Sequence, residues 1–552
     1  MTNKEIARAF QFLGEIMELH EEDPFKVRSY QNVYIQLRKL DTSLEGMPEE
    51  AIGQIKGVGK AIAAKIRELL ETGTMATLER YKALTPAGVQ EMLRVNGFGP
   101  KKVRAVWKGL GIETIGELRY AINENRLVEL KGFGLKTQEA LRKQLEYEQA
   151  SSGLFLYAGA EQDVAGLLLA LSARLPGMRV ESSGACRRKC PVLDGIDLLI
   201  GGEGLTPEML EGPLAGVVPG ADGGFSGKSP SGLPVRVQVC PPGQFGSAQF
   251  RYSAAPDFLT AFQQHFPAVL DSTFSDEGEV FEKAGLPFIA PELRESAWPL
   301  GRAAQGGLPV LIEEGDIRGV VHAHSTWSDG LHTLREMAAA CIAGGFTYLL
   351  ISDHSKSAFY ANGLSEARVA LQFAEIDTLN RELAPFRIFK GIECDILHDG
   401  SLDYPDDVLA GFDCVIASVH SNLKMELEKA TARLIRAVEH PSTRILGHPT
   451  GRLLLSRPGY PIDHHKVIDA CIANGVALEL NANPYRLDLD WQWLPYALDK
   501  GALISVNPDA HSVGGIRDIR YGIFAARKGG LGKAACLNAK DVQGFEAWIR
   551  GS

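Results

Sequence analysis

A run of ten residues, 321–330, holds side chains of the types that bind metal ions. His322 and His324 lie two residues apart and follow an apolar run, 319–321, that is typical of a β-strand. Side chains two apart on a strand point to one face of the sheet, and Asp329 follows where a loop can turn back toward the same point. Two imidazoles and a carboxylate at one point favour a divalent metal site. Two partly exposed histidines on an edge strand fit these ten residues equally well.

The histidines are concentrated in residues 318–552, which hold eleven of the thirteen. Seven apolar runs in this region are typical of strands followed by a loop and usually a helix, and they span 319–324, 347–354, 386–395, 414–420, 443–448, 476–481 and 503–511. Alternating strands and helices predict a parallel sheet, here a closed α/β barrel, with its chemistry at the carboxyl ends of the strands. Six of the seven runs end in His, Asp or Glu, which favours a metal centre over isolated structural histidines.

Residues 318–552 resemble the PHP (polymerase and histidinol phosphatase) superfamily, whose fold is a distorted (β/α)7 barrel. The resemblance implies a three-metal centre, and its nine positions are filled by His322, His324, Asp329, His354, Glu393, His420, His448, Asp509 and His511. It implies a first ion held by His322, His324, Glu393 and Asp509. It implies a second ion that shares Glu393 and takes His420 and His448, and a third held by Asp329, His354 and His511. Asp353 is expected to orient one of these ligands.

Mixed imidazole and carboxylate ligands suit Mn²⁺, Zn²⁺ or Fe²⁺ better than Mg²⁺ or Ca²⁺, although Mg²⁺ stays a candidate. Two such ions lower the pKa of a shared water to make a nucleophile, and a third offsets charge on the phosphate and the leaving group. The region is therefore expected to be a metal-dependent phosphoesterase. Asp395, His398, Asp403 and Arg486 lie on neighbouring loops, where they contact either the substrate or solvent.

Residues 1–150 have helical periodicity and repeat one glycine cassette three times, at 55–60, 95–100 and 130–135. Each cassette precedes a helix-forming run with Lys or Arg, which places backbone N–H groups and a positive helix end where a phosphate can bind. Residues 51–150 carry a net charge of +6 from 17 Lys and Arg against 11 Asp and Glu. The pattern predicts helix-hairpin-helix DNA binding without sequence reading, rather than an uncharged bundle with glycine corners. The expected phosphate contacts are Gly57, Gly59, Lys60, Gly97, Gly99, Lys101, Lys102, Gly132 and Gly134.

Residues 1–80 also resemble the small lyase-type domain at the N-terminus of family X DNA polymerases, most clearly over 23–30. Residues 81–150 would then form the helix-hairpin-helix fingers. In that resemblance Lys65 matches a lysine that some members use as a Schiff-base nucleophile on abasic sites, which requires a lowered amine pKa. A lysine that contacts phosphate or solvent is the alternative interpretation.

The pattern of apolar residues in 151–300 predicts an α/β domain. It indicates a linker at 151–153, a helix over 163–175 and strands over 178–181 and 196–200. Residues 184–200 resemble the nucleotidyltransferase signature of the family X palm, in which a Gly-Ser turn and an arginine hold triphosphate. Two carboxylates on one strand and a third from a neighbouring strand bind two metals there. The positions that match this signature are Gly184, Arg187, Arg188 and Asp197.

Other positions of the palm signature differ. Ala185 replaces the serine, and Gly195 stands at the first metal aspartate, with Asp194 displaced by one residue. Asp194 and Asp197 are three apart, so they face opposite sides of a regular strand. Arg236 stands where the third carboxylate is expected, and a cation there opposes metal binding. We expect a retained palm with a reduced thumb and with weak or lost polymerase chemistry, followed by a linker at 301–317.

Composition narrows the function classes. The formal charge of −10 argues against a uniformly basic nucleic-acid binder, but it allows a local basic face. The eight cysteines are scattered, as expected of reduced thiols in the cytoplasm. The sequence shows neither a signal-peptide pattern nor an apolar run long enough to span a bilayer, so no membrane association is expected.

The order of these regions resembles the bacterial family X DNA polymerases that carry a C-terminal PHP domain. The resemblance implies a cytoplasmic DNA-repair enzyme, expected to be a monomer, that binds gapped or 3′-ended DNA without reading its sequence and acts as a Mn²⁺-dependent 3′-5′ exonuclease. One alternative is an active gap-filling polymerase that uses Asp194 and Asp197 with dNTPs. Two others are a non-catalytic scaffold that binds DNA ends and a phosphatase of small molecules.

Overall fold

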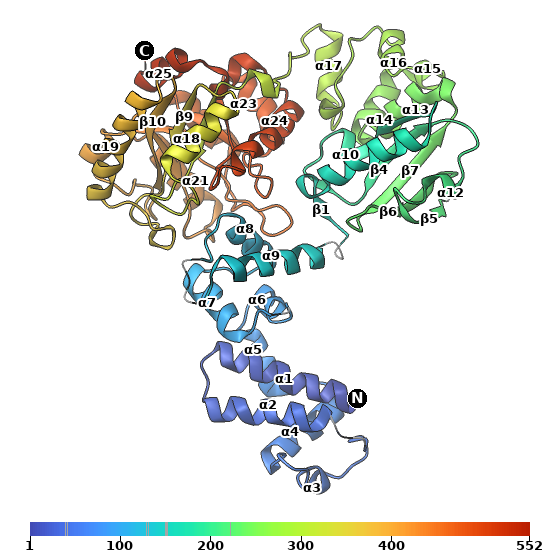
Figure 1. The fold of residues 1–552 in the computed structure, drawn as a ribbon, viewed down its shortest axis with the longest axis vertical. Coiled ribbons are helices and arrows are strands. Elements are labelled where there is room, and N and C mark those ends of the chain that lie inside the picture. Colours follow the sequence, from blue (N-terminus) through green and yellow to red (C-terminus); the bar gives the residue numbers. More distant parts are fainter. Residues whose placement is uncertain are drawn as a thin grey trace. The chain divides into compact units, whose positions relative to one another are not determined.

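The structure is a computed structural model that describes residues 1–38, 40, 42–95, 97–128, 130, 132–149, 153–220 and 222–551. It divides into two compact units, Met1–Tyr147 and Glu148–Ser552, which are taken in turn below (Figure 1). The linker predicted at 151–153 lies mostly outside the described residues. No helix in the described part of the chain is long and apolar enough to cross a membrane.

The first unit is built of helices around two hydrophobic cores. The helices are α1 (Asn3–Leu19), α2 (Pro24–Arg38), α3 (Glu49–Ile52), α4 (Lys60–Thr72), α5 (Ala76–Ala83), α6 (Ala87–Met92), α7 (Pro100–Leu110), α8 (Ile115–Asn123) and α9 (Leu135–Gln149). Helix α1 begins at a capping box in which Thr2 and Glu5 satisfy each other's backbone N–H groups. One core gathers side chains between residues 6 and 81, and the other mainly between 89 and 145.

The predicted glycine hairpins are confirmed. Gly57, Gly97 and Gly132 have φ angles of +86°, +78° and +94°, which lie in the left-handed region that glycine adopts at little cost. Gly59 and Gly99 are the N-cap residues of α4 and α7. Each hairpin therefore leads directly into a helix N-terminus, which is the geometry that the phosphate-binding prediction requires.

The second unit begins with a mixed sheet in the order β2 (Arg179–Ser182), β4 (Ile196–Gly201), β7 (Pro234–Cys240), β6 (Phe225–Lys228) and β5 (Ala215–Pro219). Strands β4 and β7 are parallel, and the other pairs are antiparallel. The short strands β1 (Phe155–Leu156) and β3 (Val192–Leu193) pair separately. The remaining helices of the domain are α10 (Tyr157–Arg174), α11 (Gly184–Arg187) and α12 (Pro207–Leu210). This sheet has the mixed topology expected of a palm.

A helical segment follows the palm sheet and has a phenylalanine core. Its helices are α13 (Phe245–Tyr252), α14 (Pro256–His265), α15 (Pro267–Leu270), α16 (Gly278–Lys283) and α17 (Trp298–Ala304). Helix α17 extends into residues 301–317, the segment predicted to be a linker. Ile312 and Ile317 are buried in the core of the following domain, and the Ile312 N–H donates a hydrogen bond to the Leu531 carbonyl. These two apolar side chains explain why the segment is packed.

The C-terminal domain is a parallel barrel. Its strands are β8 (Gly319–Ala323), β9 (Tyr348–Ile351), β10 (Arg387–Asp395), β11 (Cys414–Ser418), β12 (Thr443–Leu446), β13 (Ala477–Asn481) and β14 (Ile504–Asn507). They pair in sequence order, and a bridge between Ala323 and Ala510 brings the first strand against the last. The surrounding helices are α18 (Leu334–Ala343), α19 (Glu366–Glu382), α20 (Asp406–Leu409), α21 (Leu427–Val438), α22 (His464–Ala473), α23 (Leu494–Asp499), α24 (Ile519–Lys528) and α25 (Val542–Arg550). The predicted (β/α)7 barrel is confirmed, with every strand inside its predicted run.

Candidate metal centre

His322 reaches the centre of the barrel mouth through an irregularity in strand β8. The register of β8 against β9 shifts between Val321 and Ala323, and His322 has a φ of +64°. Strand β8 ends at Ala323, so His324 lies in the loop that follows. The two rings still converge, with centroids 5.4 Å apart. The prediction that a regular strand presents both rings was wrong in this detail, because a β-bulge re-aims His322.

Strained backbone recurs at the candidate ligands. His448 and Asp509 have φ angles of +21° and +52°, which, like that of His322, are uncommon for residues other than glycine. Such conformations cost about 1–3 kcal/mol each and persist where the surrounding structure over-determines them, often at functional sites. The strain therefore supports a functional role for this end of the barrel.

The nine predicted ligands lie together at the carboxyl ends of the strands. Ligand atoms of one group all lie within 4.8 Å of one another, and this group is His322, His324, Glu393 and Asp509. A second group with the same spacing is His324, Asp329, His354 and His511. A third is His354, Glu393 and His420. The first group is the set expected for the first ion, and the second contains the set expected for the third ion together with His324.

Glu393 is the hub of the cluster. Its Oε1 lies 2.8 Å from His448 Nε2, 3.1 Å from His420 Nε2 and 3.3 Å from His322 Nε2. Its Oε2 lies 3.0 Å from His354 Nδ1. A carboxylate with both oxygens among imidazole nitrogens is placed to bind two ions at once. This agrees with the expectation that Glu393 is a ligand of both the first and the second ion.

Buried ligand atoms test whether a cation fits. His322 Nε2, His324 Nδ1 and Asp329 Oδ2 are buried and have no hydrogen-bond partner among the described residues. Burial, together with His511 and His354, lowers the pKa of His324 to about 3, so this ring is neutral and can donate a lone pair. Such atoms cost free energy unless something binds them. The donor set therefore fits divalent metal ions of the Mn²⁺ or Zn²⁺ type.

Glu479 is a functional residue that sequence reasoning missed. Its carboxylate is fully buried, and Oε1 lies 2.5 Å from His322 Nδ1. Oε2 accepts a hydrogen bond from the His448 backbone N–H at 2.6 Å. A carboxylate on one ring nitrogen fixes the tautomer that leaves the other nitrogen for a metal. The signal was available, since Glu479 is an acid within the apolar strand β13, the run that carries no predicted ligand.

Two further aspartates form hydrogen bonds that position candidate ligands. Asp395, predicted to contact either the substrate or solvent, has Oδ1 2.5 Å from His420 Nδ1 and therefore orients that ring. Burial alone would lower the pKa of His420, but Glu393 and Asp395 outweigh it and raise the pKa to about 10. Asp353 accepts hydrogen bonds from the backbone and side chain of both Ser325 and Ser328. Asp353 thus holds the loop that carries Asp329.

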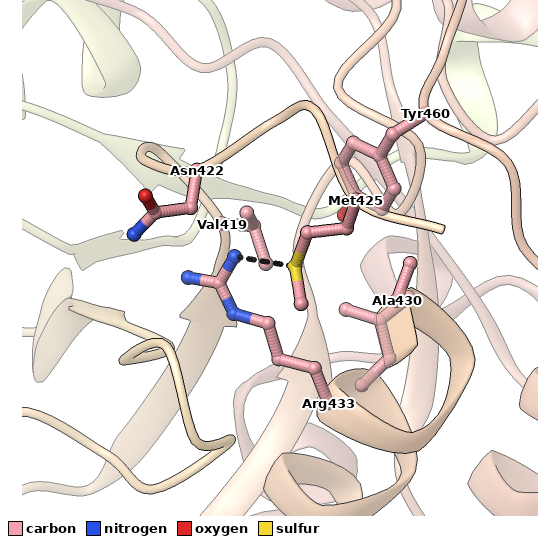
Figure 2. Close-up of a pocket in the computed structure, with 7 residues that line it drawn as sticks. Val419, Asn422, Met425, Ala430, Arg433 and Tyr460 are labelled. Carbon is pink, nitrogen blue, oxygen red and sulfur yellow. Dashed lines mark hydrogen bonds between the residues drawn. The ribbon is translucent and has the colours of Figure 1, made fainter. Parts of the chain in front are cut away.

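Arg433 ties together two loops of the metal centre (Figure 2). The side chain is only 3% exposed, and its guanidinium donates hydrogen bonds to the carbonyls of Ile396, Leu397 and Ser421. The first two follow β10 and Asp395, and the third follows His420. Figure 2 shows the guanidinium beside Met425, whose Sδ lies 3.5 Å from Nη1. Arg433 therefore fixes the loops that bring Asp395 and His420 together.

Replacing Arg433 by methionine is expected to lower the free energy of unfolding by about 3 kcal/mol, because buried carbonyls lose their donors at about 1–3 kcal/mol each. The urea midpoint of the barrel's unfolding measures this. Arg436→Met is the matched control, since Arg436 is an exposed side chain on the same helix. Its midpoint should stay near that of the wild type. Equal midpoints for both variants would contradict the assigned role.

Arg236 bridges both aspartates of the palm. Strands β4 and β7 place it directly opposite Asp197. Its Nε lies 2.6 Å from Asp197 Oδ1, and its Nη2 lies 2.7 Å from Asp194 Oδ1. The hydrogen bonds to Asp194 and Asp197 hold the pKa of Arg236 above its usual value. The guanidinium therefore stands between the two carboxylates that metal ions would have to share.

The other residues of the palm signature also have partners in the structure. Arg187 makes two hydrogen bonds to Glu277, and Arg188 makes one to Glu295. Gly184 has a φ of +56°, and a Cβ there would lie 2.3 Å from Asp197 Oδ2, so the close approach requires glycine. The two arginines thus serve as structural ion pairs in this conformation.

In the first unit, the lysines predicted to contact phosphate lie at the hairpins. Lys60 and Lys101 are exposed in the first turns of α4 and α7. The Lys102 Nζ donates to the Gly97 carbonyl at 3.4 Å. Lys65, the lyase candidate, donates to Thr77 Oγ1 at 2.6 Å. The position of these lysines suits binding of DNA phosphates at the hairpins. The hydrogen bond to Thr77 gives Lys65 a structural partner.

Known proteins resemble this chain over its full length and over parts of it. Family models match residues 1–75, a helix-hairpin-helix domain, and 89–146, a SAM-like helix-hairpin-helix tandem. The DNA polymerase/3′-5′ exonuclease PolX of Bacillus subtilis (strain 168) is 32% identical over 590 residues, which cover all of both chains. A probable phosphatase of Acetivibrio thermocellus is 30% identical over 169 residues, 30% of this chain and 65% of its own length. A probable phosphatase of Thermoanaerobacter sp. (strain X514) is 25% identical over 240 residues, 42% of this chain and 93% of its own length.

Proposed function

This chain belongs to the family X DNA polymerases of the PolX type, and from that premise we propose that its barrel hydrolyses phosphodiester bonds at DNA 3′ ends. The enzyme would act in the cytoplasm as a monomer and use Mn²⁺ or Zn²⁺. The observation that carries the proposal is the hub geometry of Glu393, whose two oxygens face four imidazoles in a buried cluster. The hairpins of the first unit supply the means to hold DNA.

The residues would divide the work in the barrel as follows. When bound, divalent ions supply an activated water and offset negative charge on the phosphate. His322, His324, Glu393 and Asp509 would hold the first ion, and the second would take Glu393, His420 and His448. The third would take Asp329, His354 and His511. Glu479 and Asp395 orient two of the imidazoles, and burial of the cluster strengthens every electrostatic interaction within it.

We further propose that polymerase chemistry is lost or weak, because Arg236 occupies the space between Asp194 and Asp197. A 5′-labelled primer annealed to a gapped template, incubated in Mn²⁺ with and without dNTPs, tests both activities in one gel. We expect shortening of the primer under both conditions and no extension. Asp197→Ala should leave the shortening rate unchanged. Template-dependent extension that Asp197→Ala abolishes would instead favour an active gap-filling polymerase.

DNA binding by the first unit is expected to depend on the hairpin lysines. Replacing Lys60, Lys101 and Lys102 by alanine should make the slope of log affinity against log salt shallower by about 2–3, since each neutralised phosphate contributes about 0.9. Fluorescence anisotropy with labelled duplexes of two unrelated sequences measures this, and both sequences should change alike. Alanine at Lys466, Lys500 and Lys533, which are exposed on the barrel, is the control. An unchanged slope in the hairpin variant would exclude these contacts.

A small-molecule phosphatase is the second candidate, favoured by the similarity to probable phosphatases. The helix-hairpin-helix unit argues for a DNA substrate, because a monophosphate needs no such unit. Hydrolysis of histidinol phosphate faster than of DNA would favour the phosphatase. A third outcome, tight DNA binding without hydrolysis in any divalent metal, would instead indicate a scaffold for DNA ends.

A further inference from the structure

The two carboxylate oxygens of Asp509 have different neighbours. Oδ1 lies 3.1 Å from His324 Nε2 and 3.4 Å from His322 Nε2, so it faces other ligands expected for the first ion. Oδ2 accepts a hydrogen bond from Asn481 Nδ2 at 2.9 Å, and Arg486 Nε lies 4.0 Å from the same oxygen. The protein therefore engages one oxygen of this candidate ligand and leaves the other directed at the position of the ion.

The side chain of Asn481 is held so that its NH₂ group faces Asp509. This side chain is fully buried at the end of strand β13. Its Oδ1 accepts a hydrogen bond from the Asn483 backbone N–H at 3.0 Å, and its Nδ2 donates a second, longer hydrogen bond to Glu479 Oε2 at 3.4 Å. Turning the amide over would set Oδ1 against two carboxylates and Nδ2 against an N–H donor. The surrounding groups therefore fix the direction in which Asn481 donates.

The number of oxygens that Asp509 offers bears on the kind of ion that fits. The group expected for the first ion offers one ligand atom from each of four residues, all within 4.8 Å of one another. A small set of ligands that includes two imidazoles suits Zn²⁺ and, with added water, Mn²⁺. Ca²⁺ takes about 6–8 oxygen ligands and often both oxygens of one carboxylate. Engaging Oδ2 within the protein therefore disfavours the larger ion.

We propose that Asn481 is a positioning residue that makes Asp509 a one-oxygen ligand and thereby selects Mn²⁺ or Zn²⁺ over Ca²⁺ at the first ion. This inference rests on the proposed function and names the residue that controls the choice of metal there. Asn481 acts through Asp509 and is not itself a ligand. Its hydrogen bond to Glu479 also ties Asp509 to the carboxylate that orients His322.

The test compares metal binding by full-length, metal-free wild type and Asn481→Leu. Electron paramagnetic resonance measures bound Mn²⁺, and titration calorimetry measures binding of Ca²⁺. Leucine is similar in size but cannot donate, so the affinity for one bound Mn²⁺ should fall about 10- to 100-fold, the usual effect of removing a residue that orients a metal ligand. The affinity for Ca²⁺ should fall less, because both oxygens of Asp509 become available to it. The ratio of the Ca²⁺ to the Mn²⁺ dissociation constant should therefore decrease.

Asn481→Asp is the second variant, because it keeps the size of the side chain and the oxygen that accepts the Asn483 N–H. It replaces the NH₂ group by an oxygen beside Asp509 Oδ2. An added oxygen ligand favours Ca²⁺, so the ratio of dissociation constants should decrease more than in Asn481→Leu. A role in packing alone predicts no change of this ratio in either variant.

Asn380→Leu is the matched control, since the Asn380 side chain also donates and accepts one hydrogen bond, both with the backbone of Ile388 near the amino end of β10. It should lower the urea midpoint of unfolding and leave both dissociation constants as in wild type. Equal losses of Mn²⁺ and Ca²⁺ affinity in the two Asn481 variants, or no loss of either, would overturn the selection role. Absence of Mn²⁺ binding by wild type would instead overturn the metal centre and the proposed function on which the inference rests.

Discussion

Replacement of Glu393 by glutamine should lower 3′-5′ digestion of DNA by a factor on the order of 10³ or more, since bound metal ions stabilise charge in the transition state by several kcal/mol and Glu393 would bind two of them. Glutamine keeps the shape of the side chain but replaces one oxygen by an NH₂ group. Whichever way the amide turns, that group faces imidazole nitrogens at His354 or at His420 and His448. The substitution also removes the negative charge that favours binding of a cation beside residue 393.

The 5′-labelled primer assay in Mn²⁺ measures this loss, and metal analysis of the purified protein should show fewer bound ions than in wild type. His448→Ala is expected to act in the same direction, because it removes the nitrogen nearest to Glu393 Oε1. Glu382→Gln is the control, since that carboxylate is exposed on helix α19 and pairs with Arg335. Digestion by Glu393→Gln at the wild-type rate would place the hydrolytic site elsewhere.

The strands of the barrel and its ligands could be predicted because two independent patterns coincide. Apolar runs mark the strands, and a parallel barrel brings their carboxyl ends to one face. Residues such as His354, Glu393 and His448 lie at those ends, so their meeting follows from topology alone. The glycine hairpins were predictable for a similar reason, since Gly57, Gly97 and Gly132 need left-handed backbone.

Side-chain direction and pairing across strands were not predictable in the same way. The bulge at His322 depends on the register between β8 and β9, which no local pattern encodes. The orienting role of Glu479 depends on its reach from β13 to His322 and His448. In the palm, Arg236 contacts both Asp194 and Asp197. The expectation that these two side chains face opposite sides assumes that both lie on a regular strand, but Asp194 precedes β4.

Glu479→Gln is expected to weaken metal binding by a factor of about 10–100, the usual effect of removing a carboxylate that orients a metal-binding histidine. The charge on Glu479 makes the metal-facing nitrogen of His322 a better donor. The second oxygen accepts the His448 backbone N–H, which helps to hold that residue in its strained conformation. Glutamine retains one oxygen, so it cannot accept both hydrogen bonds, and its NH₂ group opposes an N–H donor at one of them.

The Mn²⁺ concentration that gives half-maximal digestion is the decisive measurement, supported by bound Mn²⁺ from electron paramagnetic resonance. For Glu479→Gln the concentration should rise about 10- to 100-fold, and excess Mn²⁺ should restore most of the rate. Glu393→Gln should not be restored, because a ligand itself is lost. Glu375→Gln is the matched control, since that carboxylate accepts a hydrogen bond from Trp327 Nε1 on the same barrel. If Glu479→Gln requires no more Mn²⁺ than Glu375→Gln, then packing alone orients His322, and the buried charge at position 479 has no part in holding the ions.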